Sequence, residues 1–230
     1  MNDDKLLLKL KNILMLILLF VLFYASPYLQ LIPIRIFNIT EENITAKTNV
    51  MLNFFSNFCL AIILFFIYRK ELKKEWETFK SNMEPSLYIG IKAWFIGLVV
   101  MLISNTIISF LSNGGIAGNE AEVQKMITGF PFLMIFNAGV VAPFNEEIIF
   151  RKGFKNAISN KYLFVILSGL VFGLLHVVGT INSWVDILYI IPYGALGCAF
   201  AYTYHKTDSV FTSMFIHMAH NLILVISSVL

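Results

Sequence analysis

The chain has 230 residues, of which 58% are hydrophobic and 13% are charged. A soluble globular domain usually carries about 25% charged residues, so the composition excludes a water-soluble fold and indicates an integral membrane protein. A net charge of +3 offers no basic surface for nucleic acid, and the two cysteines lie in apolar segments, where they do not suggest a disulfide framework.

Seven apolar segments are long enough to cross a bilayer, and in lipid such segments must be helices because unpaired backbone groups are not tolerated. They are predicted at residues 13–32, 50–68, 87–111, 130–150, 162–178, 187–204 and 210–230, with the fourth continuing as a helix to about residue 158. Pro27 is expected to kink the first span. Residues 38–49 are predicted to be a polar loop, 69–86 a basic connector and 112–129 a flexible loop. The predicted fold is therefore an all-α polytopic membrane protein.

We find no internal repeat, so we expect a single integral membrane domain over residues 1–230, with three spans in 1–129 and a motif-bearing four-helix core in 130–230. With the N-terminus in the cytoplasm, all but three of the 17 Lys and Arg residues lie inside, the exceptions being Arg35, Lys47 and Lys125. This positive-inside bias predicts a multi-pass protein of the cell membrane with a cytoplasmic N-terminus.

Charged residues interrupt the fourth apolar segment at Glu146, Glu147 and Arg151. A charge at mid-bilayer costs roughly 2.5 to 3.5 kcal/mol, so a charged residue at this depth is expected to have a function. On a helix, Glu147 and Arg151 are four residues apart in the order that favours an ion pair. Glu146 is turned about 100° from that face. We therefore assign Glu147 to a structural pair and Glu146 to proton transfer.

Two later spans carry polar residues at a similar depth. If the fourth and fifth helices turn near residues 159–161, Glu146 and His176 lie roughly 21 and 24 Å from the turn. Phe172 shares a helix face with His176, while His217 and Asn221 share one in the last span. An intramembrane polar site is therefore predicted, and its proposed members are Glu146, His176, His217 and Asn221. Close helix approach is predicted at Gly169 and Gly173.

Glu146-Glu147-x-x-x-Arg151, Phe172-x-x-x-His176 and His217-x-x-x-Asn221 resemble, in order and spacing, the three motifs of the CPBP intramembrane protease family, also called Abi or CAAX-protease-like. The resemblance covers residues 130–230. It implies a membrane endopeptidase related to the type II CAAX prenyl endopeptidases and to bacterial proteins of peptide-pheromone processing and bacteriocin self-immunity. It also implies that Glu146 and His176 activate water and that His217 and Asn221 stabilise an oxyanion. Supporting roles fall to Glu147, Arg151 and Phe172.

The cofactor stays open, because family members have been described both as metalloproteases and as metal-free glutamate-dependent proteases. Glu146, His176 and His217 could supply three zinc ligands, with Glu147 a fourth, although no H-E-x-x-H spacing is present. The expected partners are a peptide or membrane-protein substrate and the lipid bilayer, without nucleic acid.

Two other function classes are compatible with intramembrane Glu and His residues. One is a non-catalytic regulatory scaffold that keeps the fold and binds a partner protein. The other is a proton-coupled transporter, which the absence of an inverted repeat in the sequence disfavours. An intramembrane endopeptidase is the leading prediction.

Overall fold

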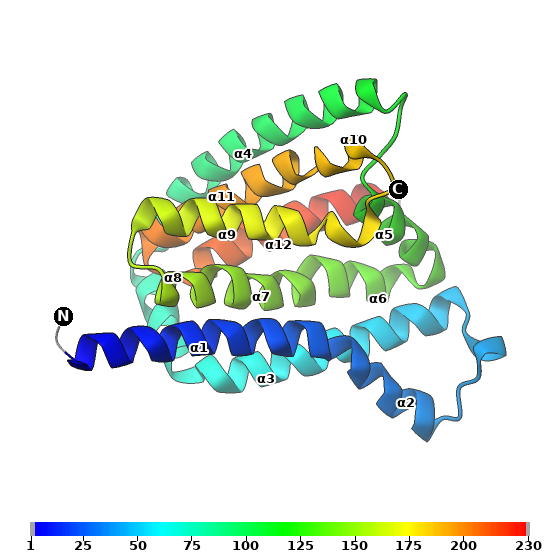
Figure 1. Cartoon of the computed structure of the whole chain (residues 1–230), viewed down its shortest axis with the longest axis horizontal. Coiled ribbons are helices and arrows are strands. Elements are labelled where there is room, and N and C mark those ends of the chain that lie inside the picture. Colours follow the sequence, from blue (N-terminus) through cyan, green and yellow to red (C-terminus); the bar gives the residue numbers. More distant parts are fainter. Residues whose placement is uncertain (1–2, 229–230) are drawn as a thin grey trace. The chain divides into compact units, whose positions relative to one another are not determined.

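The computed structural model describes residues 3–228, which are helical apart from short connections (Figure 1). In this part of the chain seven helical segments are long and apolar enough to cross a membrane. They are Asp3–Ile36, Ala46–Ser81, Met83–Leu111, Pro131–Ala157, Lys161–Thr180, Trp184–Thr207 and Val210–Ser227. The predicted all-α fold and the seven spans are confirmed. The last two residues of the predicted seventh span lie outside the described residues.

The first three spans contain α1 (Asp3–Ala25), α2 (Leu31–Ile36), α3 (Ala46–Ser81) and α4 (Met83–Leu111). A 3₁₀ turn, η1 (Ser26–Gln30), separates α1 from α2 and contains Pro27, so the helix is interrupted where a kink was predicted. Another short turn, η2 (Glu41–Asn43), precedes α3. A further helix, α5 (Gly118–Gly129), lies between α4 and the fourth span.

The fourth span consists of α6 (Pro131–Phe136), the π-helical stretch η3 (Asn137–Val141), α7 (Ala142–Glu146), the π-helical stretch η4 (Glu147–Gly153) and α8 (Phe154–Ala157). The remaining spans contain α9 (Lys161–Leu175) with the turn η5 (Val178–Thr180), α10 (Trp184–Ile187) with α11 (Ile190–Thr207), and α12 (Val210–Ser227).

The flexible loop predicted at residues 112–129 is wrong, and the basic connector predicted at 69–86 is almost entirely helical. Helix α3 continues through the basic segment to Ser81, and α4 begins at Met83. The 36 residues of α3 measure about 54 Å at 1.5 Å per residue, against roughly 30 Å of hydrocarbon. Its polar end stays helical because apolar side chains recur in it, among them Trp76, whose ring lies 5.1 Å from that of Phe211. The predicted loop 112–129 contains α5, which buries Ile127.

The described chain separates into two compact units. The first comprises the described parts of Met1–Leu72, Gln124–Ala157 and Met218–Leu230, and the second comprises Lys73–Val123 and Ile158–His217. Both units draw on segments from either side of residue 130, so the division differs from the predicted subdivision at 129/130. The single integral domain stays a prediction.

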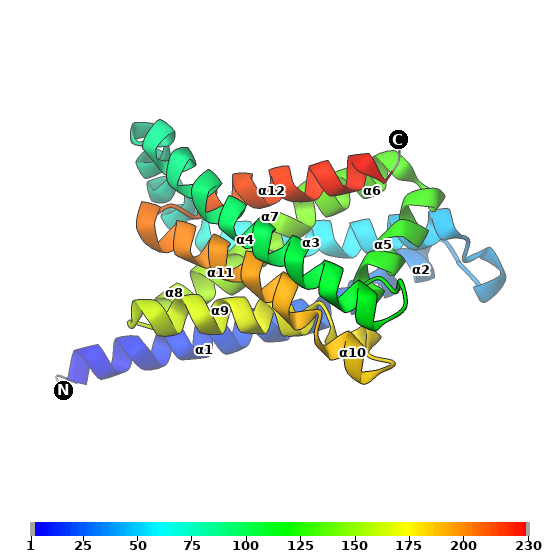
Figure 2. The ribbon, with the colours of Figure 1, turned by 90° about the horizontal axis from the view of Figure 1, so that it is seen from above.

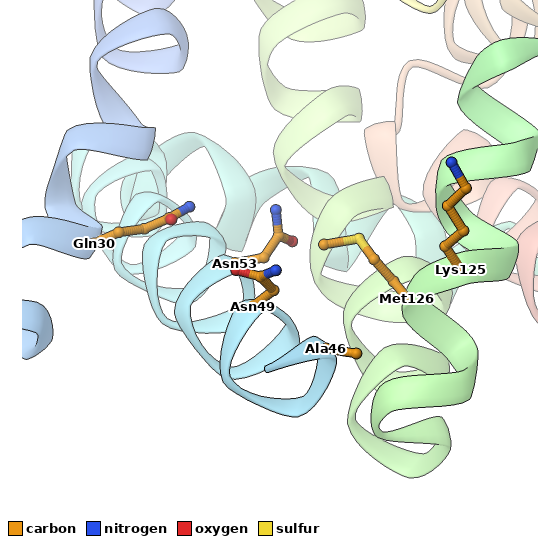
Figure 3. A pocket seen from close by; sticks show the side chains of 6 residues that line it. All are labelled: Gln30, Ala46, Asn49, Asn53, Lys125 and Met126. Carbon is orange, nitrogen blue, oxygen red and sulfur yellow. The ribbon is translucent and has the colours of Figure 1, made fainter. Parts of the chain in front are cut away.

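In the first unit, α1 packs against η4 and α8 (Figure 1). The Phe20 ring lies 6.0 Å from the rings of both Phe150 and Phe154. Gly153 lets α1 approach closely, since a Cβ at this position would lie 3.1 Å from Leu16 Cδ1. This unit also has a pocket of about 240 Å³, in which Met126 points toward Asn53 (Figure 3). The pocket is lined by Gln30, Ala46, Asn49, Asn53, Lys125 and Met126.

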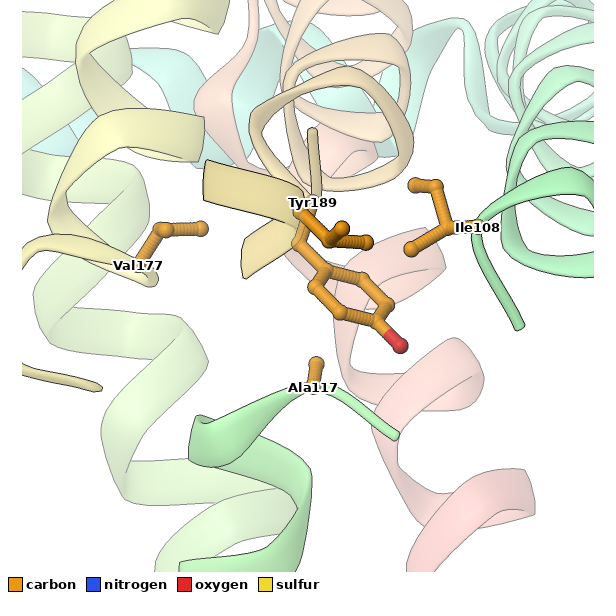
Figure 4. Packing of buried hydrophobic residues seen from close by; sticks show 5 residues of the cluster. Ile108, Ala117, Val177 and Tyr189 are labelled. Carbon is orange, nitrogen blue, oxygen red and sulfur yellow. The ribbon is translucent and has the colours of Figure 1, made fainter. Parts of the chain in front are cut away.

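In the second unit, α11 packs against both α9 and α4 (Figure 2). The contact with α9 forms at Gly169 and Gly173, which confirms the predicted close approach. A buried apolar cluster lies near the ends of these helices (Figure 4). Its members are Ile108, Ala117, Val177, Val185 and Tyr189. The Tyr189 hydroxyl donates a hydrogen bond to the Gly115 carbonyl at 2.9 Å.

Gly173→Ala is expected to lower the melting temperature of the purified protein. The added Cβ would lie 2.7 Å from the Ile190 carbonyl oxygen and 2.8 Å from the Gly194 nitrogen, and main-chain atoms cannot rotate away. Overpacking of this kind costs about 1–3 kcal/mol. Gly179→Ala is the control, because its Cβ would meet no heavy atom within 4 Å. Thermal unfolding in detergent compares the two, and equal melting temperatures would contradict the packing described here.

Candidate active site

The fourth span, which carries the acidic motif, is not a regular α-helix. Its two π-helical stretches, η3 and η4, flank the single α-helical turn of α7. Pro143 is at the start of α7 and has no N–H to donate, so it cannot continue the hydrogen-bond pattern of the preceding turn. π-Helical turns are rare and occur frequently at functional sites. Glu146 and Glu147 lie on the boundary between α7 and η4.

Glu147 and Arg151 form the predicted ion pair. Arg151 Nε lies 3.3 Å from Glu147 Oε1, and both side chains are fully buried. A pair removed from water in this way is costly to break, because either partner alone would be a buried uncompensated charge. The next residue, Lys152, contacts Glu71 of α3 instead, with 3.7 Å between Nζ and Oε2. Glu147 is therefore structurally engaged, as predicted, and Glu146 precedes it at the end of α7.

Asn221 of α12 contacts the fourth span directly. Its Nδ2 donates to the Ala138 carbonyl oxygen at 2.9 Å. That carbonyl needs an external donor, because the N–H of Ala142 bonds to the Asn137 carbonyl and Pro143 has no N–H. The structure thus gives Asn221 a role in holding η3. Its role toward an oxyanion stays a prediction.

His176 ends α9 in the second unit, where its Nδ1 lies 2.8 Å from the Phe172 carbonyl oxygen. A carbonyl oxygen only accepts hydrogen bonds, so Nδ1 must carry the hydrogen. In the neutral ring the lone pair is then on Nε2, the nitrogen that can accept a hydrogen bond or a proton. The helix end therefore selects one tautomer of His176.

Phe172 contacts His176 and His217, the two histidines of the second unit that were predicted to be in the site. Its ring centroid lies 4.3 Å from that of His176 and 5.7 Å from that of His217, which is buried. His217 also stacks on Phe200 at 4.5 Å, and His176 on Tyr193 at 4.7 Å. Tyr193 and Phe200 were not predicted. Their seven-residue spacing in the sixth span, which places both on one helix face, was the available signal.

Glu75 of α3 holds the start of the helix that carries His217. Its carboxylate accepts hydrogen bonds from the Val210 N–H at 2.8 Å and the Tyr204 hydroxyl at 2.9 Å. The first N–H groups of a helix lack partners within the helix, and a carboxylate there also opposes the positive end of the helix dipole. This contact fixes where α12 begins, two turns before His217.

The predicted site residues are divided between the two units. The first unit contains Glu146, the Glu147–Arg151 pair and Asn221, and the second contains Phe172, His176 and His217. Convergence of Glu146 with the two histidines stays a prediction. Within residues 3–228, no group of three or more His, Cys, Asp or Glu side chains could hold a metal ion. A zinc site formed by Glu146, His176 and His217 stays a prediction.

Comparisons with known proteins agree with the motifs. Residues 128–223 match the family described as type II CAAX prenyl endopeptidase Rce1-like. The chain is 27% identical over 176 residues to "Putative membrane peptidase YdiL" of Bacillus subtilis, covering 73% of this chain and 67% of the relative. It is 25% identical over 170 residues to "UPF0177 protein YxdF" of Lactococcus lactis, covering 71% and 89%. No solved structure matches the chain. The resemblance inferred from the three motifs is confirmed.

Proposed function

Because residues 128–223 match the type II CAAX prenyl endopeptidase family, we propose that the protein is an intramembrane endopeptidase. Its substrate would be a peptide or a membrane-associated protein, cut within or near the bilayer. One observation carries the proposal: the matched stretch contains all three motifs, in a chain with seven apolar helices.

In the proposed reaction, the Glu146 carboxylate takes a proton from water and the water oxygen attacks the carbonyl carbon of the scissile peptide bond. His176 helps to hold the water, since the Nδ1–H of its ring is directed to the Phe172 carbonyl and Nε2 can accept from the water. His217 and Asn221 meet the developing oxyanion. Glu146 then passes the proton to the leaving amine as the carbon–nitrogen bond breaks.

The biological process that we propose is maturation of a peptide pheromone or bacteriocin, or immunity to one. The protein would act in the cell membrane with its N-terminus in the cytoplasm, which the distribution of Lys and Arg supports. Terminal proteomics of membranes from cells that make wild-type or Glu146→Gln protein tests the proposal. New peptide termini that appear only with the wild-type protein would identify the substrate.

Chelation is expected to leave the activity of the purified protein unchanged, with metal far below one ion per chain. The physical reason is that the proposed base is a carboxylate, which needs no ion to accept a proton from water. Activity in EDTA and elemental analysis of the same sample measure this, with Glu146→Gln as the inactive reference. Loss of activity in EDTA that zinc restores, together with stoichiometric zinc, would instead support Glu146, His176 and His217 as ligands.

A further inference from the structure

Four asparagines of the first unit form a hydrogen-bonded network between α3 and the fourth span. Asn137 Nδ2 donates to Asn53 Oδ1 at 2.7 Å, and Asn57 Nδ2 donates to Asn137 Oδ1 at 3.2 Å. Asn57 Nδ2 also lies 3.0 Å from Asn53 Oδ1. Eight residues beyond Asn137, Asn145 Nδ2 donates to the Asn57 carbonyl at 2.9 Å. Asn137 and Asn145 are almost fully buried.

Asn137 and Asn145 share a helix face only because η3 is π-helical. On a regular α-helix, residues eight apart differ by about 80° in direction. A π-helical turn accommodates one extra residue, so Asn137 and Asn145 are related as residues seven apart on a regular α-helix are. Their directions then differ by only about 20°. Both can therefore reach one turn of α3, where Asn53 and Asn57 are four residues apart.

The segment held between these two contacts leads directly to the proposed base. It contains the π-helical turn and Pro143, and both features weaken the helix's own hydrogen-bond pattern. The direction of the residues that follow must then be set by contacts from outside the helix. Glu146 is the next residue after Asn145, about 100° around the helix.

We propose that Asn53, Asn57 and Asn137 are positioning residues that orient Glu146 for proton transfer. This inference rests on the proposed function. Interhelical hydrogen bonds in membranes contribute little to stability on average, so the network has a small part in holding the fold. A general base, by contrast, must be placed within hydrogen-bond reach of its proton, and a 1 Å displacement can cost about 100-fold in rate.

Asn137→Leu tests the proposal, because leucine has a similar size and removes both side-chain hydrogen bonds of Asn137. We expect kcat to fall about 10- to 100-fold with KM nearly unchanged. Asn57→Ala is the second variant, in case Asn137→Leu does not accumulate. In a double-mutant cycle, Asn57→Ala and Asn137→Ala should be non-additive in kcat, because the two residues share one network.

Ser56→Ala is the matched control. Ser56 also lies on α3, where its hydroxyl donates to the main-chain carbonyl of Asn53 at 2.9 Å and accepts a hydrogen bond from Gln30 at 3.3 Å. Neither bond involves an asparagine side chain of the network, and the bond from Gln30 leads to η1 and not to the fourth span. We expect Ser56→Ala to lower the melting temperature about as much as Asn57→Ala does, but to leave kcat normal. If the asparagine variants lose no more kcat than Ser56→Ala, the positioning role is overturned. If Glu146→Gln is fully active in the same assay, the proposed function itself fails.

Discussion

Glu146→Gln is expected to reduce substrate processing about 10²- to 10⁴-fold while the protein accumulates normally in the membrane. Glutamine keeps the shape of the side chain and most of its hydrogen bonding but cannot take a proton from water. The loss should therefore fall on turnover and not on folding. Processing of a co-expressed substrate and membrane abundance, measured in parallel, give the two quantities.

Glu77→Gln is the control for this substitution. Glu77 lies near the end of α3, is exposed, and forms a surface ion pair with Lys80 at 2.8 Å, so its loss should change neither quantity measurably. A regulatory scaffold makes the opposite prediction for the site variant. If Glu146→Gln keeps full biological activity at normal abundance, the protein acts by holding a partner and not by cutting a substrate.

Arg151→Ala is expected to reduce abundance and melting temperature before any specific effect on catalysis. Glu147 would be left fully buried without its positive partner, and breaking a buried pair in this way costs about 3–5 kcal/mol. Quantitative immunoblotting of membranes and thermal unfolding in detergent measure the loss. Lys80→Ala, which breaks an exposed ion pair, should have little effect by either measure.

A double substitution separates loss of the pair from loss of packing. Glu147→Leu combined with Arg151→Met replaces both charges with apolar groups, and such replacements are often neutral or stabilising. The double variant should regain most of the abundance that Arg151→Ala loses, although the supporting role of the pair in catalysis would be removed. Equally poor abundance for both variants would show that the Arg151 side chain stabilises the fold through other contacts.

The seven spans and the Glu147–Arg151 pair were predictable because they depend on local properties of the sequence. Apolar length alone identifies a spanning helix. A spacing of four residues places two side chains together whether the backbone turn is α-helical or slightly wider. The approach of α9 to α11 was predictable for a similar reason, since Gly169 and Gly173 remove the side chains that would keep two helices apart.

Other features depend on contacts between distant segments. Residues 69–86 were predicted to be a basic connector and 112–129 a flexible loop, but tertiary packing of Trp76 and Ile127 stabilises helices in both. No pattern in the sequence indicates that the Asn221 amide donates to Ala138, or that Glu75 caps α12. Those bonds form because backbone groups near a proline or at a helix start need partners, and the partner is chosen by the fold.

The π-helical stretch η3 also determines how this span should be aligned with those of its relatives. A related chain with one residue fewer between Asn137 and Asn145 would form a regular α-helix there, and its two asparagines, now seven apart, would still face α3. The same deletion in α6, which is a regular α-helix, would instead rotate every following side chain by about 100°. A single-residue gap inside this transmembrane helix is therefore structurally permitted within η3, although gaps are normally placed in loops.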